Sequence, residues 1–94
     1  MKLKIYTMRR TVYEGETSRV TLPTAMGEVT ILDHHEMYAT ILEPGSLRFE
    51  VPVTHELPQS HEKSAVTHGE NSLPIKGGFM EVRDNNEVRI LADE

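Results

Sequence analysis

Apolar and polar side chains alternate with a period of two residues through most of this chain. Because successive side chains of a β-strand point to opposite faces, this spacing predicts strands that each bury one face. The alternation is clearest over residues 2–6, 19–23, 29–31, 47–53, 80–83 and 88–90. The best helical candidate, residues 34–42, is short, and its second half is rich in Tyr, Thr and Ile, so we expect a strand there.

Turn-forming residues separate these runs. Gly and Asn tolerate the positive φ that tight turns require, and Pro fixes φ, so clusters of the three residues mark chain reversals. Such clusters lie at residues 14–16, 25–27, 43–45, 77–78 and 84–86. Gly77 and Gly78 also fall inside a strand pattern, where glycine usually indicates a bulge or a close approach of two backbones. Many short strands separated by turns predict an all-β fold, a two-sheet antiparallel β-sandwich of about 8–10 short strands.

Residues 54–73 break this pattern. They are rich in His, Glu and Ser, contain Pro58 and Gly69, and have almost no apolar periodicity. This composition predicts a long polar loop or insert, exposed and mobile. With 94 residues the chain has the length of one domain, so we expect a single β-sandwich domain over residues 1–94 that carries this insert.

Composition narrows the classes of partner. The formal net charge is −5, and phosphate backbones bind cationic surfaces, so we expect no nucleic-acid partner. The chain has no Cys, which excludes disulfides, thiolate zinc sites and a Cys nucleophile. No apolar run approaches the roughly 18 residues that cross a bilayer, and residues 1–6 form a strand pattern rather than a signal peptide. We therefore expect a soluble, cytoplasmic protein that reaches a membrane only indirectly, through a partner.

The histidines raise the hypothesis of a metal site. His34 and His35 are adjacent, so on a strand they point to opposite faces and cannot easily share one ion. His55, His61 and His68 lie in the polar segment, with spacings that match no compact zinc motif. An exposed loop that merely contains histidine is the simpler interpretation, and we expect no metal.

Catalytic arrangements are not indicated either. Ser60 and Ser64 lie near His61, but a mobile insert holds no base at hydrogen-bond distance from a hydroxyl. Asp84 and Glu87 flank a turn, and we expect both to be ordinary solvated acids. No Gly-rich loop precedes a helix in the way that phosphate binding requires. The sequence therefore predicts no catalytic site and no cofactor.

Three blocks of sequence carry a family resemblance. They comprise residues 1–7 with 12–16 and 20–23, residues 27–35 with 42–48, and residues 77–82 with 86–93. In this order and spacing the blocks resemble the epsilon subunit of the bacterial and chloroplast ATP synthase, whose mitochondrial counterpart is called delta. No single block is specific, but three unrelated blocks rarely coincide by chance. The resemblance covers most of the chain outside the polar segment and implies the N-terminal β-sandwich domain of that family.

The resemblance implies a structural role. Members of this family sit at the foot of the central stalk, between the gamma subunit and the ring of membrane-embedded c subunits. One face of the sandwich packs on gamma, and loops at one end press on the polar loops of the c-ring. The chain would then be a non-catalytic rotor subunit that couples proton flow to ATP synthesis. It would be peripheral, on the cytoplasmic face of the inner membrane, as part of the ATP synthase.

The resemblance also implies contact residues. For the c-ring interface they are Gly27, Glu28, Ile31 and His35, with Glu28 pairing to basic loop residues of the ring. For the gamma interface they are Phe79, Met80 and Glu81.

Two departures from the family pattern qualify these expectations. Around the middle loop, Asp33 and Met37 take the places where the family commonly has Pro, so the loop is unusually polar. In most members a helical hairpin, which inhibits ATP hydrolysis, begins where this sequence ends at Glu94. We expect a form, natural or shortened, without those inhibitory helices. The alternative hypothesis is a free-standing β-sandwich binding module whose histidine-containing insert holds a ligand or metal.

Overall fold

The structure, a computed structural model, describes the backbone of residues 1–55 and 65–94, and the side chains of residues 1–52 and 69–94. The described residues form nine strands and no helix. The strands are β1 (Lys2–Tyr6), β2 (Thr11–Glu16), β3 (Arg19–Thr24), β4 (Gly27–Leu32), β5 (Tyr38–Leu42), β6 (Gly45–His55), β7 (Ala65–Ile75), β8 (Gly77–Arg83) and β9 (Glu87–Asp93). The all-β prediction is confirmed, as is the strand expected in the second half of residues 34–42.

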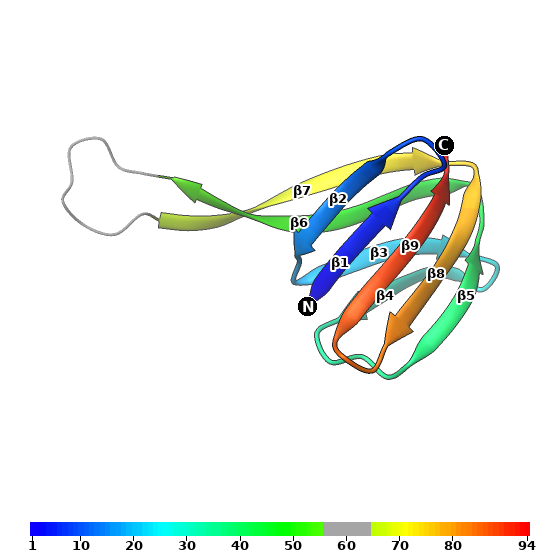
Figure 1. Ribbon diagram of the computed structural model, residues 1–94, viewed down its shortest axis with the longest axis horizontal. Helices are drawn as coiled ribbons and strands as arrows, with labels where there is room; N and C mark the ends of the chain where they lie inside the picture. Colours follow the sequence, from blue (N-terminus) through cyan, green and yellow to red (C-terminus); the bar gives the residue numbers. More distant parts are fainter. Residues whose placement is uncertain (56–64) are drawn as a thin grey trace.

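The strands form one hydrogen-bonded sheet that folds over into two layers (Figure 1). The front sheet has the order β2-β1-β9-β8-β5, and the back sheet has the order β4-β3-β6-β7. The layers are joined where β5 and β6 run in succession along β3: Thr24 pairs with Leu42, and Val20 pairs with Phe49. A strand that passes from one sheet to the next at a bend is the usual way to make such a corner.

The sandwich has two loop ends. The β1–β2, β3–β4, β5–β6 and β7–β8 connections meet at one end, which we call the Gly27 end. The β2–β3, β4–β5 and β8–β9 connections meet at the other, which we call the His35 end. The two ends organise the surfaces described below.

One strand pair departs from the expected antiparallel arrangement. β1 and β9 are parallel, with Leu3 opposite Val88 and Ile5 opposite Ile90, whereas the other pairs among the described strands are antiparallel. These two strands lie at opposite ends of the chain, so no hairpin turn fixes their relative direction. Local sequence therefore carries no signal for this pairing.

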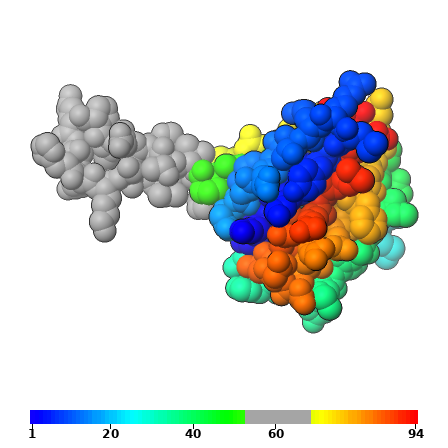
Figure 2. Space-filling view, in the orientation of Figure 1, coloured from blue at the N-terminus to red at the C-terminus, as the bar shows by residue number. Residues whose placement is uncertain are grey.

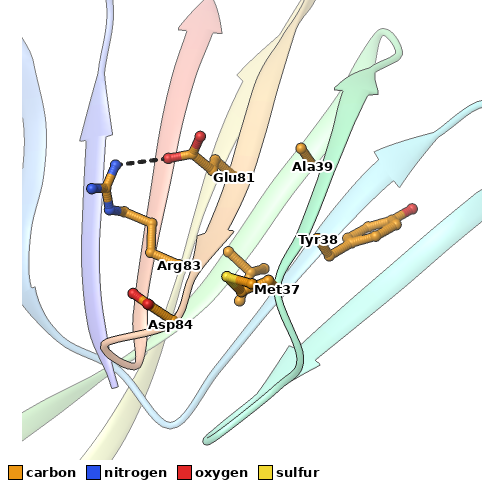
Figure 3. Close-up of a pocket in the computed structure, with 7 residues that line it drawn as sticks. Met37, Tyr38, Ala39, Glu81, Arg83 and Asp84 are labelled. Carbon is orange, nitrogen blue, oxygen red and sulfur yellow. Dashed lines mark hydrogen bonds and ion pairs between the residues drawn. The ribbon is translucent and has the colours of Figure 1, made fainter.

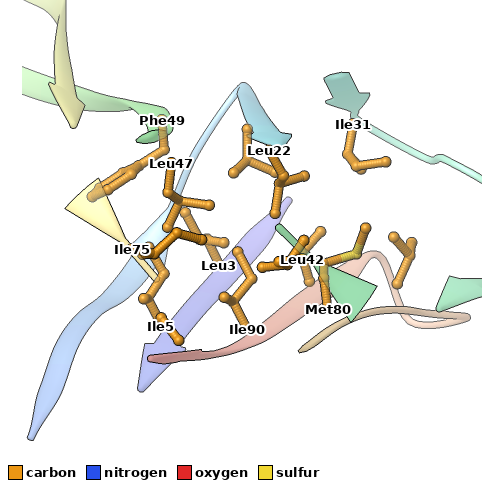
Figure 4. Packing of buried hydrophobic residues seen from close by; sticks show 14 of the residues in the cluster. Leu3, Ile5, Leu22, Ile31, Leu42, Leu47, Phe49, Ile75, Met80 and Ile90 are labelled. Carbon is orange, nitrogen blue, oxygen red and sulfur yellow. The ribbon is translucent and has the colours of Figure 1, made fainter. Parts of the chain in front are cut away.

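The core fills the space between the two layers (Figure 4). Alternate residues of the strands supply it, as the period of two predicts; Leu3, Ile5 and Ile90 are at most 1% exposed. The remaining buried apolar residues are Met1, Val20, Leu22, Ile31, Leu42, Leu47, Phe49, Ile75, Met80, Val82, Val88 and Ala92. Burying one Val, Leu, Ile, Phe or Met side chain contributes about 1.5–3 kcal/mol, so this single cluster is the main stabilising feature of the small domain.

The polar loop expected over residues 54–73 is wrong at both ends. Residues 54–55 belong to β6 and residues 65–73 belong to β7. The two strands pair over eleven residues, from Gly45 opposite Ile75 to His55 opposite Ala65. Residues 56–64 lie outside the described residues. β7 is an edge strand, and Glu70, Asn71 and Ser72 are exposed, so it lacks the apolar alternation that marks strands with a well-buried face.

Two glycines are placed by close contacts. A Cβ on Gly78 would lie 2.3 Å from the carbonyl oxygen of Leu91, which confirms the close backbone approach expected there. Gly15, predicted to form a turn, instead lies within β2, and the chain reverses after Glu16. A Cβ on Gly15 would lie 2.9 Å from the hydroxyl of Tyr13, which donates a hydrogen bond to the carbonyl oxygen of Glu16 at 2.6 Å. Gly15 therefore makes room for this ring.

Candidate functional site

The β3–β4 hairpin forms a braced tip at the Gly27 end. Gly27 takes a φ of 103°, which closes the two-residue turn after Thr24. The hydroxyl of Thr24 donates a hydrogen bond to the carbonyl oxygen of Gly27 at 2.7 Å and accepts one from the backbone N–H of Met26 at 3.1 Å. Met26 at the tip is 90% exposed. The tip is thus a firmly held turn that presents one large apolar side chain to solvent.

Glu28 follows this tip and is already paired within the domain. Nη2 of Arg48, on β6, lies 3.0 Å from Oε1 and 2.8 Å from Oε2 of Glu28. Both side chains are substantially exposed, and exposed ion pairs contribute only about 0–1 kcal/mol. The carboxylate can therefore exchange this partner for a basic group of another subunit at little cost.

The structure does not bring the four expected ring-contact residues together. Ile31 is fully buried in the core, so the expectation that its side chain contacts another subunit is wrong. His35 is exposed, but it lies in the β4–β5 connection at the opposite end of β4 from Gly27. β4 has six residues, so its first residue, Gly27, and its last residue, Leu32, are about 17 Å apart at 3.3–3.4 Å per step. Only Gly27 and Glu28 share one end.

A polar network ties the β4–β5 connection to the β8–β9 turn. Oδ1 of Asp33 lies 2.8 Å from the amino group of Met1, and it also accepts a hydrogen bond from Nδ2 of Asn86 at 2.8 Å. Oδ1 of Asn86 accepts a hydrogen bond from the backbone N–H of His34 at 2.8 Å. The hydrogen bond from the amino terminus, and then that from Asn86, lower the pKa of the Asp33 carboxyl. The loop that carries His35 is thereby held in place.

The outer face of the front sheet is turned towards the viewer in Figure 2. It carries a row of exposed apolar side chains. Ile41 on β5 pairs with Phe79 on β8, which pairs with Leu91 on β9. Their exposed fractions are 69%, 46% and 50% in this order. We call Ile41, Phe79 and Leu91 the apolar row. Met80 points the other way and is fully buried, so its expected contact with gamma is wrong.

A charged network borders the apolar row. Glu81 pairs with Arg83 at 2.9 Å, and the largely buried Glu87 lies near Arg83, Arg89 and Lys4. Burial alone would raise the pKa of Glu87, but the hydrogen bond and charge of Arg89, with the charge of Lys4, lower it overall. Glu87 is therefore not the solvated acid expected from its place beside a turn. It holds three cations at fixed positions on the outer face.

An open hollow of about 470 Å³ lies over the paired strands β5 and β8 near the His35 end (Figure 3). Met37, Tyr38 and Ala39 line one side, and Glu81, Val82, Arg83 and Asp84 line the other. No sequence pattern indicated this hollow, because it depends on which strand lies beside β8. The mixture of apolar and charged side chains suits a protein partner, and none of them is held as a nucleophile beside a base.

The alternative hypothesis places a metal on His55, His61 and His68, and His61 and the side chains of the other two lie outside the described residues. Among the residues that the structure does describe, no group of three or more His, Asp or Glu could hold a metal ion. The same residues contain no helix of the length and apolar character that a membrane span needs.

Comparison with known proteins identifies the family. The profile of the family described as "ATP synthase, Delta/Epsilon chain, beta-sandwich domain" matches residues 1–94. The chain belongs to this family. The ATP synthase epsilon chain of Persephonella marina is 39% identical over 102 residues, which cover 97% of this chain and 70% of that protein. The epsilon chain of Neisseria meningitidis is 30% identical over 93 residues, which cover 99% of this chain and 56% of that protein.

Solved structures agree on the fold of this delta/epsilon domain. A chain of the Euglena gracilis mitochondrial ATP synthase, from a structure of OSCP, F1 and the c-ring, superposes with a TM-score of 0.73 at 25% identity. The match covers 98% of this domain and 49% of that chain. A chain from the central stalk and c-ring of the Tetrahymena thermophila enzyme gives the same TM-score at 20% identity, over 100% of this domain and 63% of that chain. The domain thus spans about half to two thirds of these relatives.

Proposed function

We propose that this protein is a non-catalytic central-stalk subunit of a proton-translocating ATP synthase, linking the gamma subunit to the c-ring. Membership of the delta/epsilon family supports the proposal, and it does not favour the alternative of a free-standing binding module. In this role the protein couples proton flow to ATP synthesis. It lies on the cytoplasmic face of the membrane and reaches it only through the complex.

The apolar row carries the proposal. Single exposed apolar residues are common, but three in register across neighbouring strands form a contiguous patch of the kind that protein partners cover. Phe79 and Leu91 lie on β8 and β9, and each of these strands is hydrogen-bonded to a neighbouring strand on both sides. The backbone under these two residues is therefore rigid. We infer that gamma packs on this row, with Phe79 as the anchor and Glu81 at its border.

The Gly27 end is then the part that meets the c-ring. It presents Met26 at a braced turn and Glu28 beside it, both exposed. A carboxylate whose internal ion pair with Arg48 is weak suits contact with basic residues of polar ring loops. His35 lies at the other end of the sandwich, so it is not part of the proposed c-ring surface.

The test measures binding of the isolated domain to purified gamma subunit by calorimetry. Phe79→Asp places a charge in the centre of the apolar row, and we expect it to weaken binding at least about a hundredfold, as loss of a central anchor does at many interfaces. Ser46→Asp, an exposed substitution on β6 of the back sheet, is the matched control and leaves binding unchanged. Equal affinities of the two variants, with both folded, would refute the assignment of this face.

A further inference from the structure

The front sheet ends at an open strand edge. All five residues of β5 pair with β8 on one side, whereas on the other side only Leu42 has a partner, Thr24 of β3. Among the described residues, Tyr38–Ile41 therefore have no strand beside their second edge. Alternate residues of this stretch direct their backbone N–H and C=O groups to that open side, where they can pair with another strand.

This edge lacks the protection that the other edges have. Soluble proteins discourage strand addition with charged side chains or Pro on edge strands. β2 carries Glu14 and Glu16, β4 carries Glu28, and β7 carries Glu70 and Pro74. The sequence of β5, Tyr-Ala-Thr-Ile-Leu, contains neither a charge nor a Pro. An edge without such protection can accept a further strand.

The surroundings of β5 favour an apolar strand with basic ends. Met37 and Ile41 are 70% and 69% exposed, and the hollow of about 470 Å³ lies over the first half of β5 and the paired end of β8. Exposed acids stand at both ends: Glu36 and Asp84 near Tyr38, and Glu43 directly after Leu42. Arg83, the cation in the hollow, is already paired with Glu81.

We propose that the β5 edge binds an extended segment of a partner protein, which adds a strand to the front sheet. The segment alternates apolar and small polar residues and has Lys or Arg at its ends. Backbone hydrogen bonds to Tyr38–Ile41 supply the attachment, and side chains that enter the hollow supply the selectivity. The proposal does not depend on which partner covers the apolar row.

The test uses a synthetic peptide, acetyl-Lys-Val-Thr-Val-Thr-Val-Lys-amide, and the isotope-labelled domain in solution. We expect the peptide to shift the amide resonances of Tyr38–Ile41 and to slow hydrogen exchange of alternate amides there roughly tenfold. A twin peptide, N-methylated at alternate peptide nitrogens on the edge that would face β5, cannot form the strand ladder and should not bind. Binding of the twin with equal affinity would show that side chains alone make the contact and would overturn the proposal.

Variants of the domain locate the edge. Ile41→Lys adds a charge to β5 and is expected to abolish peptide binding, whereas Leu32→Lys adds the same charge to β4, where Leu32 is 56% exposed, and leaves it intact. Phe79→Asp should retain peptide binding even though it weakens binding to the gamma subunit. Failure of one proposal is therefore distinguishable from failure of the other. Shifts that map to β2, β4 or β7, or pairing of two copies through β5 without peptide, would contradict the proposal.

Discussion

At the scale of single residues, the tightest backbone contact among the described glycines is that of Gly78, where a Cβ would lie 2.3 Å from the carbonyl oxygen of Leu91. The glycine pair at 77–78 stood out inside a strand pattern, and the structure confirms a close approach of backbones. Ile31 and Met80 belong to blocks that resemble a known family, but their side chains are core residues. A block of sequence shared with a family does not separate surface residues from buried ones, because both are retained in the same strand.

Gly78→Ala should be among the most destabilising substitutions in the chain. Its Cβ would lie 2.3 Å from the Leu91 carbonyl oxygen and 3.1 Å from Cα of Ala92, both backbone atoms, at a φ of 149°. Strained φ and forced backbone shifts together cost about 2–4 kcal/mol. Gly15→Ala is the matched comparison, because its Cβ meets only the movable end of the Tyr13 ring. Urea unfolding should rank Gly78→Ala well below Gly15→Ala, and a reversed order would contradict the close approach.

Glu87 makes stability depend on pH in the acid range. Because its pKa in the folded state is lowered from 4.5, the stabilisation is fully present above the unfolded value and is lost as pH falls through the folded pKa. We expect the free energy of unfolding to drop more steeply below about pH 5 in the wild type than in Glu87→Gln. Urea titrations at a series of pH values measure this, with the exposed Glu14→Gln as control. Parallel curves for wild type and Glu87→Gln would show that the network with Arg89 and Lys4 is unimportant.

At the scale of elements, alternation and turn residues predicted most strands, and the failures have common physical causes. β7 is an edge strand with many exposed polar residues, so no apolar alternation marked it. The parallel pairing of β1 with β9 joins segments distant in sequence, and no local pattern sets its direction. The hollow beside β5 and the open edge follow from strand order, which periodicity does not specify. The candidate surfaces therefore depend on which strands are neighbours in the sheet, and no local sequence pattern specifies this.

Asn86 joins the β8–β9 turn to the β4–β5 connection. It takes a φ of 58°, and its side chain bonds both Asp33 and the backbone N–H of His34. Asn86→Ala removes both bonds and replaces a residue that tolerates positive φ with one that does not, so we expect a loss of about 1–3 kcal/mol. Asn86→Gly removes the same bonds but tolerates the φ, and should cost less. Denaturant unfolding separates the two, and faster amide exchange at His34 should accompany both variants; unchanged exchange would mean that the β4–β5 connection is held by other contacts.

At the scale of the whole molecule, the apolar row and the Gly27 end occupy different parts of one rigid sandwich. The row lies on the outer face of the front sheet, across β9, β8 and the edge strand β5. The Gly27 end is formed by the connections of both sheets (Figure 1). A subunit that transmits force between two neighbours needs such separated contacts on a body that does not bend. In this molecule the single hydrophobic core between the two layers supplies that stiffness.

The separation predicts that coupling and gamma binding can be lost independently. Glu28→Lys reverses the charge at the Gly27 end and places it beside Arg48, while the apolar row is untouched. Since one exposed ion pair contributes about 0.2–1 kcal/mol, we expect a partial fall in ATP-driven proton pumping relative to ATP hydrolysis in membrane vesicles that carry the assembled enzyme. Gamma binding should stay at the wild-type level, and Glu14→Lys on the distant strand β2 should change neither quantity. If Glu28→Lys weakened gamma binding as strongly as Phe79→Asp, the two surfaces would have to be one, and the assignment of the Gly27 end to the ring would fail.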